Sequence, residues 1–222
     1  MWSLRKSTRF YNFPAAQTPR TRFLDKEEIQ LLLNTSSKGF RPILITALHT
    51  GMRKGAILNL KWSDVDFKNR IITVQDSKSG KKRMLPMDDT LCETLSVLPT
   101  RFQKGYVFPS PVGKGKPLYD CRKQFSSAVK MAEIENIRFH DLRYTFASHL
   151  IMAGVDVMTV KELLGHASIT MTMRYSHLAP DHRLRAIKTL DSAYQTDTKT
   201  DTVENSGIDP LAQVVENTRV GT

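Results

Sequence analysis

The chain contains only two cysteines, Cys92 and Cys121, among its 222 residues. Their spacing matches no metal-binding or disulfide pattern, so we expect two reduced thiols in a cytoplasmic protein. No apolar run approaches the roughly 18 residues that a membrane-spanning helix needs, and residues 1–22 hold no apolar stretch of the secretory kind. Internal repeats are absent as well. The sequence therefore argues against secreted disulfide-rich, membrane-spanning and repeat proteins, and no membrane partner is expected.

Charge is abundant and unevenly distributed. The net charge is +11, from 33 Lys and Arg against 22 Asp and Glu. Residues 191–222 hold six acids and two bases, a net of −4, which leaves +15 for residues 1–190. A field this basic favours a polyanion such as nucleic acid, although charge alone fits a basic protein without that role nearly as well.

The length predicts one sizeable domain, or one domain with appendages. Residues 1–22 are basic and broken by prolines, which is typical of a linker or arm. Residues 23–192 carry the periodic apolar pattern of a folded domain. Residues 193–222 are polar and acidic, and we expect a disordered or docking tail there.

The apolar pattern predicts an α+β fold that is mostly helical, with one small antiparallel sheet. A capping box at Asp25 and Glu28 opens the first helix, and Gly51 closes the second. A β-prone stretch, 65–74, is followed by the turn Ser79-Gly80 and the partner strand 84–86, which form a basic hairpin. The other expected helices span residues 41–49, 54–60, 88–98, 120–131, 140–152, 157–164, 169–175 and 181–190.

His140 and Arg143 are spaced to share one helix face. We expect Leu142, Phe146 and Leu150 to form a neighbouring stripe toward the core, with the pair beside it in a groove. There the arginine can bind a phosphate with two hydrogen bonds, and the histidine can donate a hydrogen bond or move a proton. Alone, such a pair is more often part of a solvated surface.

Tyr175 follows a second histidine, His166, by nine residues. Gly165 ends a helix just before His166, where a histidine usually serves only as a cap. Most tyrosines are plain core or surface aromatics. A tyrosine acts as a nucleophile only where a strongly positive site stabilises its phenolate.

Two basic residues upstream are candidates for that positive site. Arg53 lies just after a helix stop, and Lys78 lies in the basic hairpin. Each is, by itself, better explained as surface charge.

The order of these elements is more specific than any one of them. Thr-Gly-Met-Arg, a basic hairpin, His-x-x-Arg, Leu-Gly-His and a tyrosine follow one another. In this order they resemble the signature of the tyrosine recombinases, the phage-integrase family. The segment Leu-Gly-His-Ala-Ser-Ile-Thr-Met-Thr-Met-Arg-Tyr-Ser-His is similar to the family's C-terminal box. The resemblance extends from about Leu24 to Pro180 and implies a tyrosine-recombinase catalytic domain at 23–192, with a small three-stranded antiparallel sheet.

The resemblance implies a role for each matching residue. Arg53 and Arg143 would hold the non-bridging oxygens of the scissile phosphate. His140 would be a further phosphate ligand and candidate proton acceptor, and His166 would donate another hydrogen bond. Tyr175 would attack, leaving a 3′-phosphotyrosyl bond and a free 5′-hydroxyl.

Lys78 would protonate the departing 5′-oxygen. Lys81 and Lys82 are rivals for this role, but the spacing to Leu85-Pro86 favours Lys78. We also expect Lys81, Lys82 and Arg83 to contact DNA. The bond energy is kept and the charge is handled by side chains, so neither ATP nor a metal ion is expected.

The expected partners are double-stranded DNA and further copies of the chain. By the resemblance, the protein would be a monomer when free and a homotetramer on DNA. In such a tetramer the segment Asp181–Leu190 and the tail could dock onto a neighbouring subunit, in cis or in trans.

Two departures from the family pattern matter. Members usually carry Glu three residues after the first arginine, where this chain has Ala56. We expect reduced cleavage, because a carboxylate there would support the arginine. Members usually also have a preceding helical domain that closes around DNA, which residues 1–22 are too short to form. We therefore expect weak, salt-sensitive binding.

The sequence leaves two other functions open. One is a DNA-binding relative without catalysis, which Ala56 makes conceivable. The other is a type IB topoisomerase, which shares the phosphotyrosine chemistry, although the Leu-Gly-His box favours a recombinase. A metal-dependent nuclease is disfavoured.

Overall fold

The computed structural model describes residues 22–75, 82–113, 115–179, 187–190 and 194. Those up to 179 belong to one compact unit, and the last two stretches belong to a second unit, 181–222. Residues 187–190 are helical, and the rest of the helix expected at 181–190 lies outside the described residues. The expected linker at 1–22 and the tail at 193–222 also fall almost wholly outside them.

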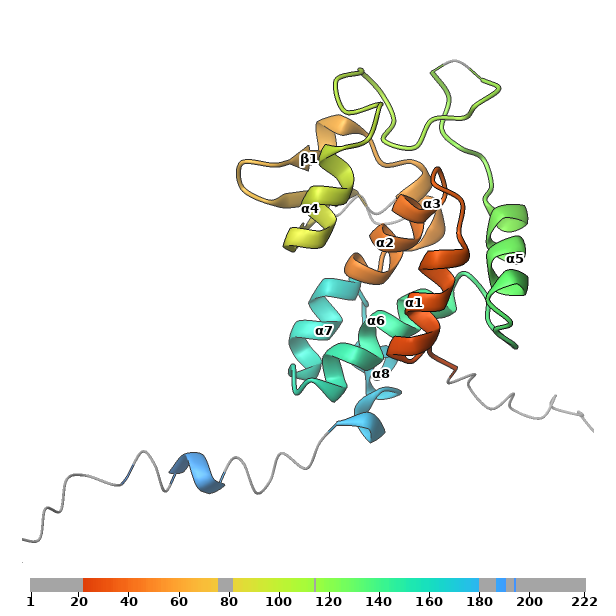
Figure 1. The fold of residues 1–222 in the computed structure, drawn as a ribbon. Coiled ribbons are helices and arrows are strands. Elements are labelled where there is room, and N and C mark those ends of the chain that lie inside the picture. The colour runs from red at the N-terminus through yellow and green to blue at the C-terminus, as the bar shows by residue number, and fades with distance from the viewer. Residues whose placement is uncertain (1–21, 76–81, 114, 180–186, 191–193, 195–222) are drawn as a thin grey trace, which may run out of the picture. The chain divides into compact units, whose positions relative to one another are not determined.

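The first unit is mostly helical, as predicted (Figure 1). Its α-helices are α1 (Lys26–Thr35), α2 (Arg41–Thr50), α3 (Lys54–Leu58), α4 (Asp89–Ser96), α5 (Arg122–Met131), α6 (Asp141–Met152), α7 (Val157–Leu164) and α8 (Thr170–Met173). Two 3-10 helices, η1 (Trp62–Asp64) and η2 (Ser176–Leu178), complete it. None of the described helices is long and apolar enough to cross a bilayer.

Short-range signals set several helix ends. Asp25 and Glu28 form the predicted capping box at the start of α1. Gly51 and Gly165 end α2 and α7 in the left-handed conformation, with φ of 59° and 64°. Glycine adopts this conformation without the steric cost that a Cβ imposes.

Several predicted helices are shorter than expected; those at 88–98 and 120–131, for example, span Asp89–Ser96 and Arg122–Met131. The helix expected at 54–60 ends at Leu58. The helix expected at 169–175 spans only Thr170–Met173, so Tyr175 lies in the turn that leads into η2. These boundaries lie within one or two residues of the prediction, which is the usual spread at helix ends.

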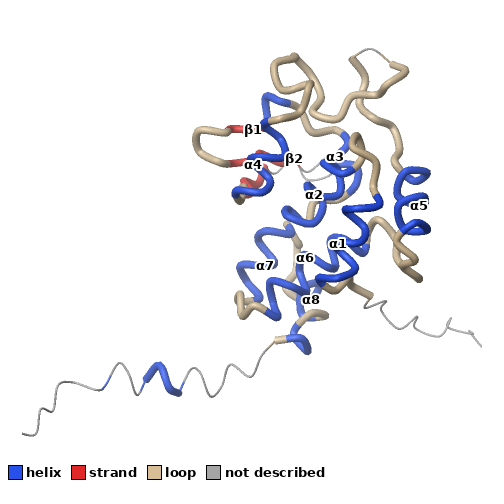
Figure 2. Tube along the Cα trace, in the orientation of Figure 1, coloured by secondary structure: helices blue, strands red, loops and turns tan. Residues whose placement is uncertain are grey.

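The predicted antiparallel sheet is confirmed. It has the order β1 (Val65–Asp66), β2 (Ile71–Gln75), β3 (Lys82–Pro86), and lies beside α4 (Figure 2). Ile72 pairs with Leu85 and Val74 with Arg83. Cross-strand partners share a face, so Arg83 lies on the same face as the buried Ile72, Val74 and Leu85.

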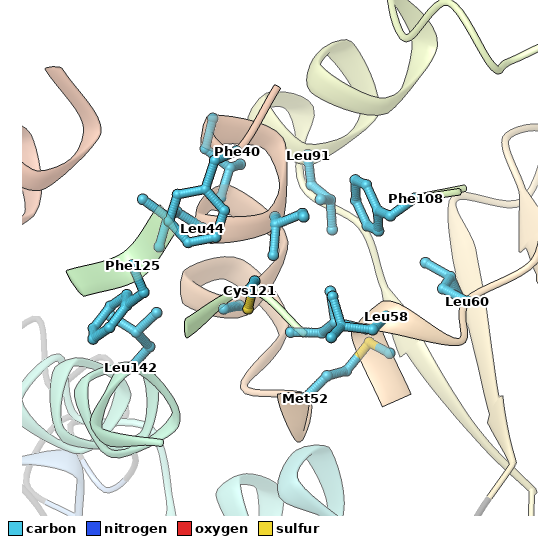
Figure 3. Close-up of a cluster of buried hydrophobic side chains, with 14 of the residues drawn as sticks. Phe40, Leu44, Met52, Leu58, Leu60, Leu91, Phe108, Cys121, Phe125 and Leu142 are labelled. Carbon is cyan, nitrogen blue, oxygen red and sulfur yellow. The ribbon is translucent and has the colours of Figure 1, made fainter. Parts of the chain in front are cut away.

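The main core surrounds α2 (Figure 3). A second cluster lies where α6, α7 and η2 meet. It consists of Tyr144, Ala147, Ile151, Val160, Leu164 and Tyr175.

Helix α6 packs against α2 on one side and α7 and η2 on the other. Of the stripe expected from sequence, Leu142 is buried, but Phe146 and Leu150 are only half-buried. Because α6 has neighbours on several sides, Arg143 is itself buried rather than lying beside the stripe.

Candidate active site

Arg143 joins three helices at the centre of the first unit. Its side chain is buried, and Nη1 and Nη2 donate hydrogen bonds of 2.7 Å to the carbonyls of Gly51 and Leu164. These carbonyls lie at the C-terminal ends of α2 and α7, where the helix dipole favours a cation. The two helix ends thus hold a buried guanidinium in one orientation without a carboxylate among the described partners.

Burial lowers the pKa of Arg143 to about 10, and the nearby charges of Arg53 and Arg83 act in the same direction. The group stays charged at neutral pH, since its pKa remains well above 7. Three of its N–H hydrogens remain after the two backbone bonds, so it can still bind an anion.

A cavity of about 330 Å³ opens beside Arg143. It brings together five of the six catalytic residues predicted from the sequence. Its lining residues are Arg53, Arg138, His140, Asp141, Arg143, Tyr144, His166, Met171, Arg174 and Tyr175. Four arginines face one carboxylate in this set, so the cavity favours an anion.

A larger cavity of about 600 Å³ adjoins this one and shares Arg138 and His140 with it. Its other walls are mainly the apolar side chains of Phe125, Val129 and Phe139. Because the arginines and the tyrosines gather in the smaller cavity, that is where phosphate chemistry is best supported.

Arg53 enters the site from the N-cap position of α3, two residues after the stop at Gly51. A Cβ at Gly51 would overlap the Phe146 ring and lie 2.9 Å from Leu164 Cδ2, so a larger residue would displace these side chains as well as strain the backbone. Arg53 is exposed, and no ion pair or hydrogen bond to its guanidinium occurs among the described residues. Its charge is therefore available to a ligand.

The two histidines of the cavity are held neutral near pH 7. His140 precedes α6 at its N-cap, and burial, with Arg143 nearby, lowers its pKa. His166 follows Gly165, and burial together with Arg143 and Arg53 lowers its pKa to about 4. A neutral imidazole can accept a proton as well as donate a hydrogen bond.

His166 is also oriented by a neighbour. Its Nδ1 lies 2.9 Å from Oγ1 of the buried Thr172. A hydrogen bond at Nδ1 leaves Nε2 as the atom that can reach a ligand.

Tyr175 is buried, with 3% of its surface exposed. Its ring packs on that of Tyr144, with centroids 4.6 Å apart and planes tilted by 48°. Burial raises the pKa of the Tyr175 phenol, while the charge of Arg143 acts in the opposite direction. The phenol is thus protonated at rest, beside a cation that would stabilise its anion.

The basic hairpin is only partly described. Lys78 and Lys81 lie outside the described residues. Lys82 is exposed on β3, whereas Arg83 is half-buried and faces α7. A Cβ built on Gly165 would overlap the Arg83 guanidinium, so these two residues are in close contact.

Sequence reasoning missed five residues that line the cavity: Arg138, Asp141, Tyr144, Met171 and Arg174. Arg174 is exposed and directly precedes Tyr175, and its charge lowers the pKa of His140 and His166. Its adjacency to Tyr175 was visible in the sequence and could have suggested it. Nothing in the sequence distinguishes Tyr144 from an ordinary core aromatic.

No three side chains of His, Cys, Asp or Glu gather as a metal site within the described ranges.

The comparisons with known proteins all point to the same family. The family model described as "Phage integrase family" matches residues 22–182. The integrase of Salmonella phage P22 is 31% identical over 208 residues, which are 88% of this chain and 54% of that protein. The chain thus spans about half the length of this curated relative.

Solved structures show the same fold. The catalytic domain of bacteriophage HP1 integrase is 33% identical, with a TM-score of 0.62, covering 78% of this chain and 98% of that domain. The XerH site-specific recombinase bound to its difH substrate is 25% identical, with a TM-score of 0.63, covering 81% of this chain and 56% of that protein. From the matched family model and these likenesses together, this chain belongs to the phage integrase family, the tyrosine recombinases.

Proposed function

We propose that this chain cleaves and rejoins duplex DNA through a covalent bond between Tyr175 and a 3′-phosphate. The observation that carries the proposal is the single cavity shared by Arg53, His140, Arg143, His166 and Tyr175. A tyrosine beside unpaired N–H donors and cationic groups is the arrangement that phosphoryl transfer to a phenol requires.

Each of these residues has its own role in the reaction. Arg53 and Arg143 hold the non-bridging oxygens of the phosphate and offset the negative charge that grows in the transition state. His166 donates a further hydrogen bond. His140, neutral near pH 7, accepts the proton of Tyr175 as the phenolic oxygen attacks phosphorus.

The bond from phosphorus to the 5′-oxygen then breaks, and Lys78 protonates the departing oxygen. Attack by a 5′-hydroxyl of another strand reverses the step and restores Tyr175. The phosphodiester energy is retained in the phosphotyrosyl bond, so this exchange consumes no ATP.

The DNA partner is supported by the XerH complex with its substrate and by the four arginines of the cavity. We propose a monomer in free solution and a homotetramer on DNA, with residues 23–192 as the catalytic domain, 1–22 as a basic linker and 193–222 as an acidic tail. Lys81 and Lys82 would bind the DNA backbone from the hairpin.

The test uses duplexes from the DNA flanking this chain's own gene, with a 5′-bridging sulfur at candidate positions to trap cleavage. A denaturing gel detects the covalent adduct, and mass spectrometry of the tryptic peptide Tyr175–Arg183 locates it. We expect an adduct on Tyr175 that Tyr175→Phe abolishes. DNA binding without an adduct would instead favour a non-catalytic DNA-binding relative.

A further inference from the structure

The hydroxyl of Tyr144 is buried without a hydrogen-bond partner among the described residues. The residue is 6% exposed. Buried tyrosine hydroxyls usually find a partner, because leaving one unpaired is destabilising. Phenylalanine would fill the same space without this cost, so packing alone does not account for a hydroxyl at this position.

The position of Tyr144 suggests where its acceptor comes from. The side chain lines the same cavity as Tyr175, and their ring centroids are 4.6 Å apart. The Tyr144 ring also belongs to the buried cluster with Ala147 and Ile151, which fixes its orientation. A donor held in place beside the attacking residue is preorganised, and stabilises charge only when charge appears.

Both phenols are protonated in the resting site. Burial raises the pKa of Tyr144 and of Tyr175. Tyr144 therefore keeps its proton and acts as a donor, not as a base. The oxygen of Tyr175 becomes a strong acceptor only when it loses its proton in the reaction.

We propose that Tyr144 is a further catalytic residue, whose hydroxyl donates a hydrogen bond to the phenolic oxygen of Tyr175 while that oxygen attacks the DNA phosphate. This inference rests on the proposed function. The proton of Tyr175 leaves to His140, the bond from Tyr175 to phosphorus forms, and the bond to the 5′-oxygen breaks. The O–H bond of Tyr144 stays intact throughout.

The experiment compares wild type with Tyr144→Phe in three measurements. They are the stability of the free protein to urea, binding of the sulfur-containing duplex, and the single-turnover rate of adduct formation from pH 6 to pH 10. Tyr119→Phe is the matched control, since that ring is 94% exposed and outside the cavity.

We expect Tyr144→Phe to be at least as stable as wild type, because it removes an unpaired buried hydroxyl. Its DNA affinity should stay within about twofold. Adduct formation at pH 7 should slow about ten- to a hundredfold, the effect expected for losing one hydrogen bond to a charged acceptor. The rate should be lower across the whole range from pH 6 to pH 10, since the Tyr175 oxygen has lost a stabilising bond in the transition state.

The outcomes separate the two proposals. Wild-type adduct with an unchanged rate and pH profile in Tyr144→Phe overturns the role of Tyr144 and leaves the proposed function intact. So does a loss of rate accompanied by a matching loss of stability to urea, because that marks altered packing alone. Absence of any adduct with wild type overturns the proposed function, and the role of Tyr144 with it.

Discussion

His166 and Thr172 are joined by a hydrogen bond of 2.9 Å between the imidazole Nδ1 and the threonine hydroxyl. Thr172 is fully buried on α8, three residues before Tyr175, so this bond links the ring of His166 to the segment that carries the proposed nucleophile. This single hydrogen bond therefore helps to hold both His166 and the segment of Tyr175, two residues to which the proposed reaction gives a role.

Replacing Thr172 by valine should slow cleavage while preserving the fold. Valine keeps the shape but leaves Nδ1 of His166 without its partner, and one hydrogen bond of about 1–1.5 kcal/mol corresponds to a roughly five- to tenfold slower reaction. Single-turnover adduct formation measures this. Thr172→Ser keeps the hydroxyl and should remain near the wild-type rate. If both variants lost the same rate, the loss would come from altered packing and not from the hydrogen bond.

Gly165→Ala should destabilise the protein and impair cleavage together. Gly165 has φ of 64°, and an added Cβ would overlap the guanidinium of Arg83. Strain in this backbone region costs about 1 kcal/mol, and displacement of Arg83 adds to it. Urea unfolding gives the difference.

Gly115→Ala is the matched control for this variant. Gly115 has φ of 74° with nothing within 4 Å of an added Cβ, so it isolates the backbone strain. If both variants lost the same stability and both retained cleavage, the overlap with Arg83 would have no effect beyond the backbone strain.

The stability of the free protein should fall between pH 7 and pH 5. His166 has a pKa of about 4 in the folded chain, against about 6.5 when unfolded, and the pKa of His140 is lowered as well. In this window the unfolded chain binds more protons than the folded one, so acid favours unfolding. For His166 the expected loss of unfolding free energy is at most about 2 kcal/mol.

Urea unfolding at both pH values measures this loss. The charged side chains near His166 are Arg143, Arg53, Arg174 and Arg83, all of which disfavour its protonation. His166→Asn removes the titrating group and should therefore flatten the pH dependence. An unchanged slope in this variant would assign the effect to other groups.

Ala56→Glu should raise the rate of cleavage. Ala56 lies half-buried on α3, one turn beyond Arg53, and its amide donates a 2.9 Å hydrogen bond to the Arg53 carbonyl. A carboxylate at this position would help to orient an arginine that has no ion pair among the described residues. We expect an increase of several-fold, roughly the value of one charge-assisted bond at a partly exposed site.

Ala56→Gln is the control, since it adds nearly the same volume without charge. If Ala56→Glu gains neither rate nor stability over Ala56→Gln, Arg53 is already sufficiently oriented by the end of α2 and the start of α3.

Arg174→Ala should weaken DNA binding in a salt-dependent way. The arginine is exposed at the cavity and lacks a hydrogen bond or ion pair in the described part of the chain. One lost phosphate contact should reduce the slope of log affinity against log salt by about 0.9. Fluorescence anisotropy with a short duplex from 50 to 200 mM salt measures the slope.

Arg41→Ala is the matched control for this measurement. Arg41 is also exposed but begins α2, the helix whose opposite end faces the site. A slope that falls equally for both variants would mean general charge attraction and no contact by Arg174.

The sequence alone determined where most helices and the sheet lie, and it identified five residues of the site. The capping box at Asp25 and the glycine stops at 51 and 165 depend on near neighbours, and they formed as expected, as did a strand in the β-prone stretch 65–74. The ordered motifs around Arg53, His140, Arg143, His166 and Tyr175 likewise identified residues that do share one cavity.

Only the tertiary structure decided how those residues are held. Arg143 is buried between the ends of α2 and α7, and its bond to Gly51 spans 92 positions of the chain. The inward direction of Arg83, the approach of Arg174 and the unpaired hydroxyl of Tyr144 arise in the same way. Helix caps and strand alternation depend on residues a few positions apart, whereas burial and the meeting of distant segments depend on the packing of the whole core.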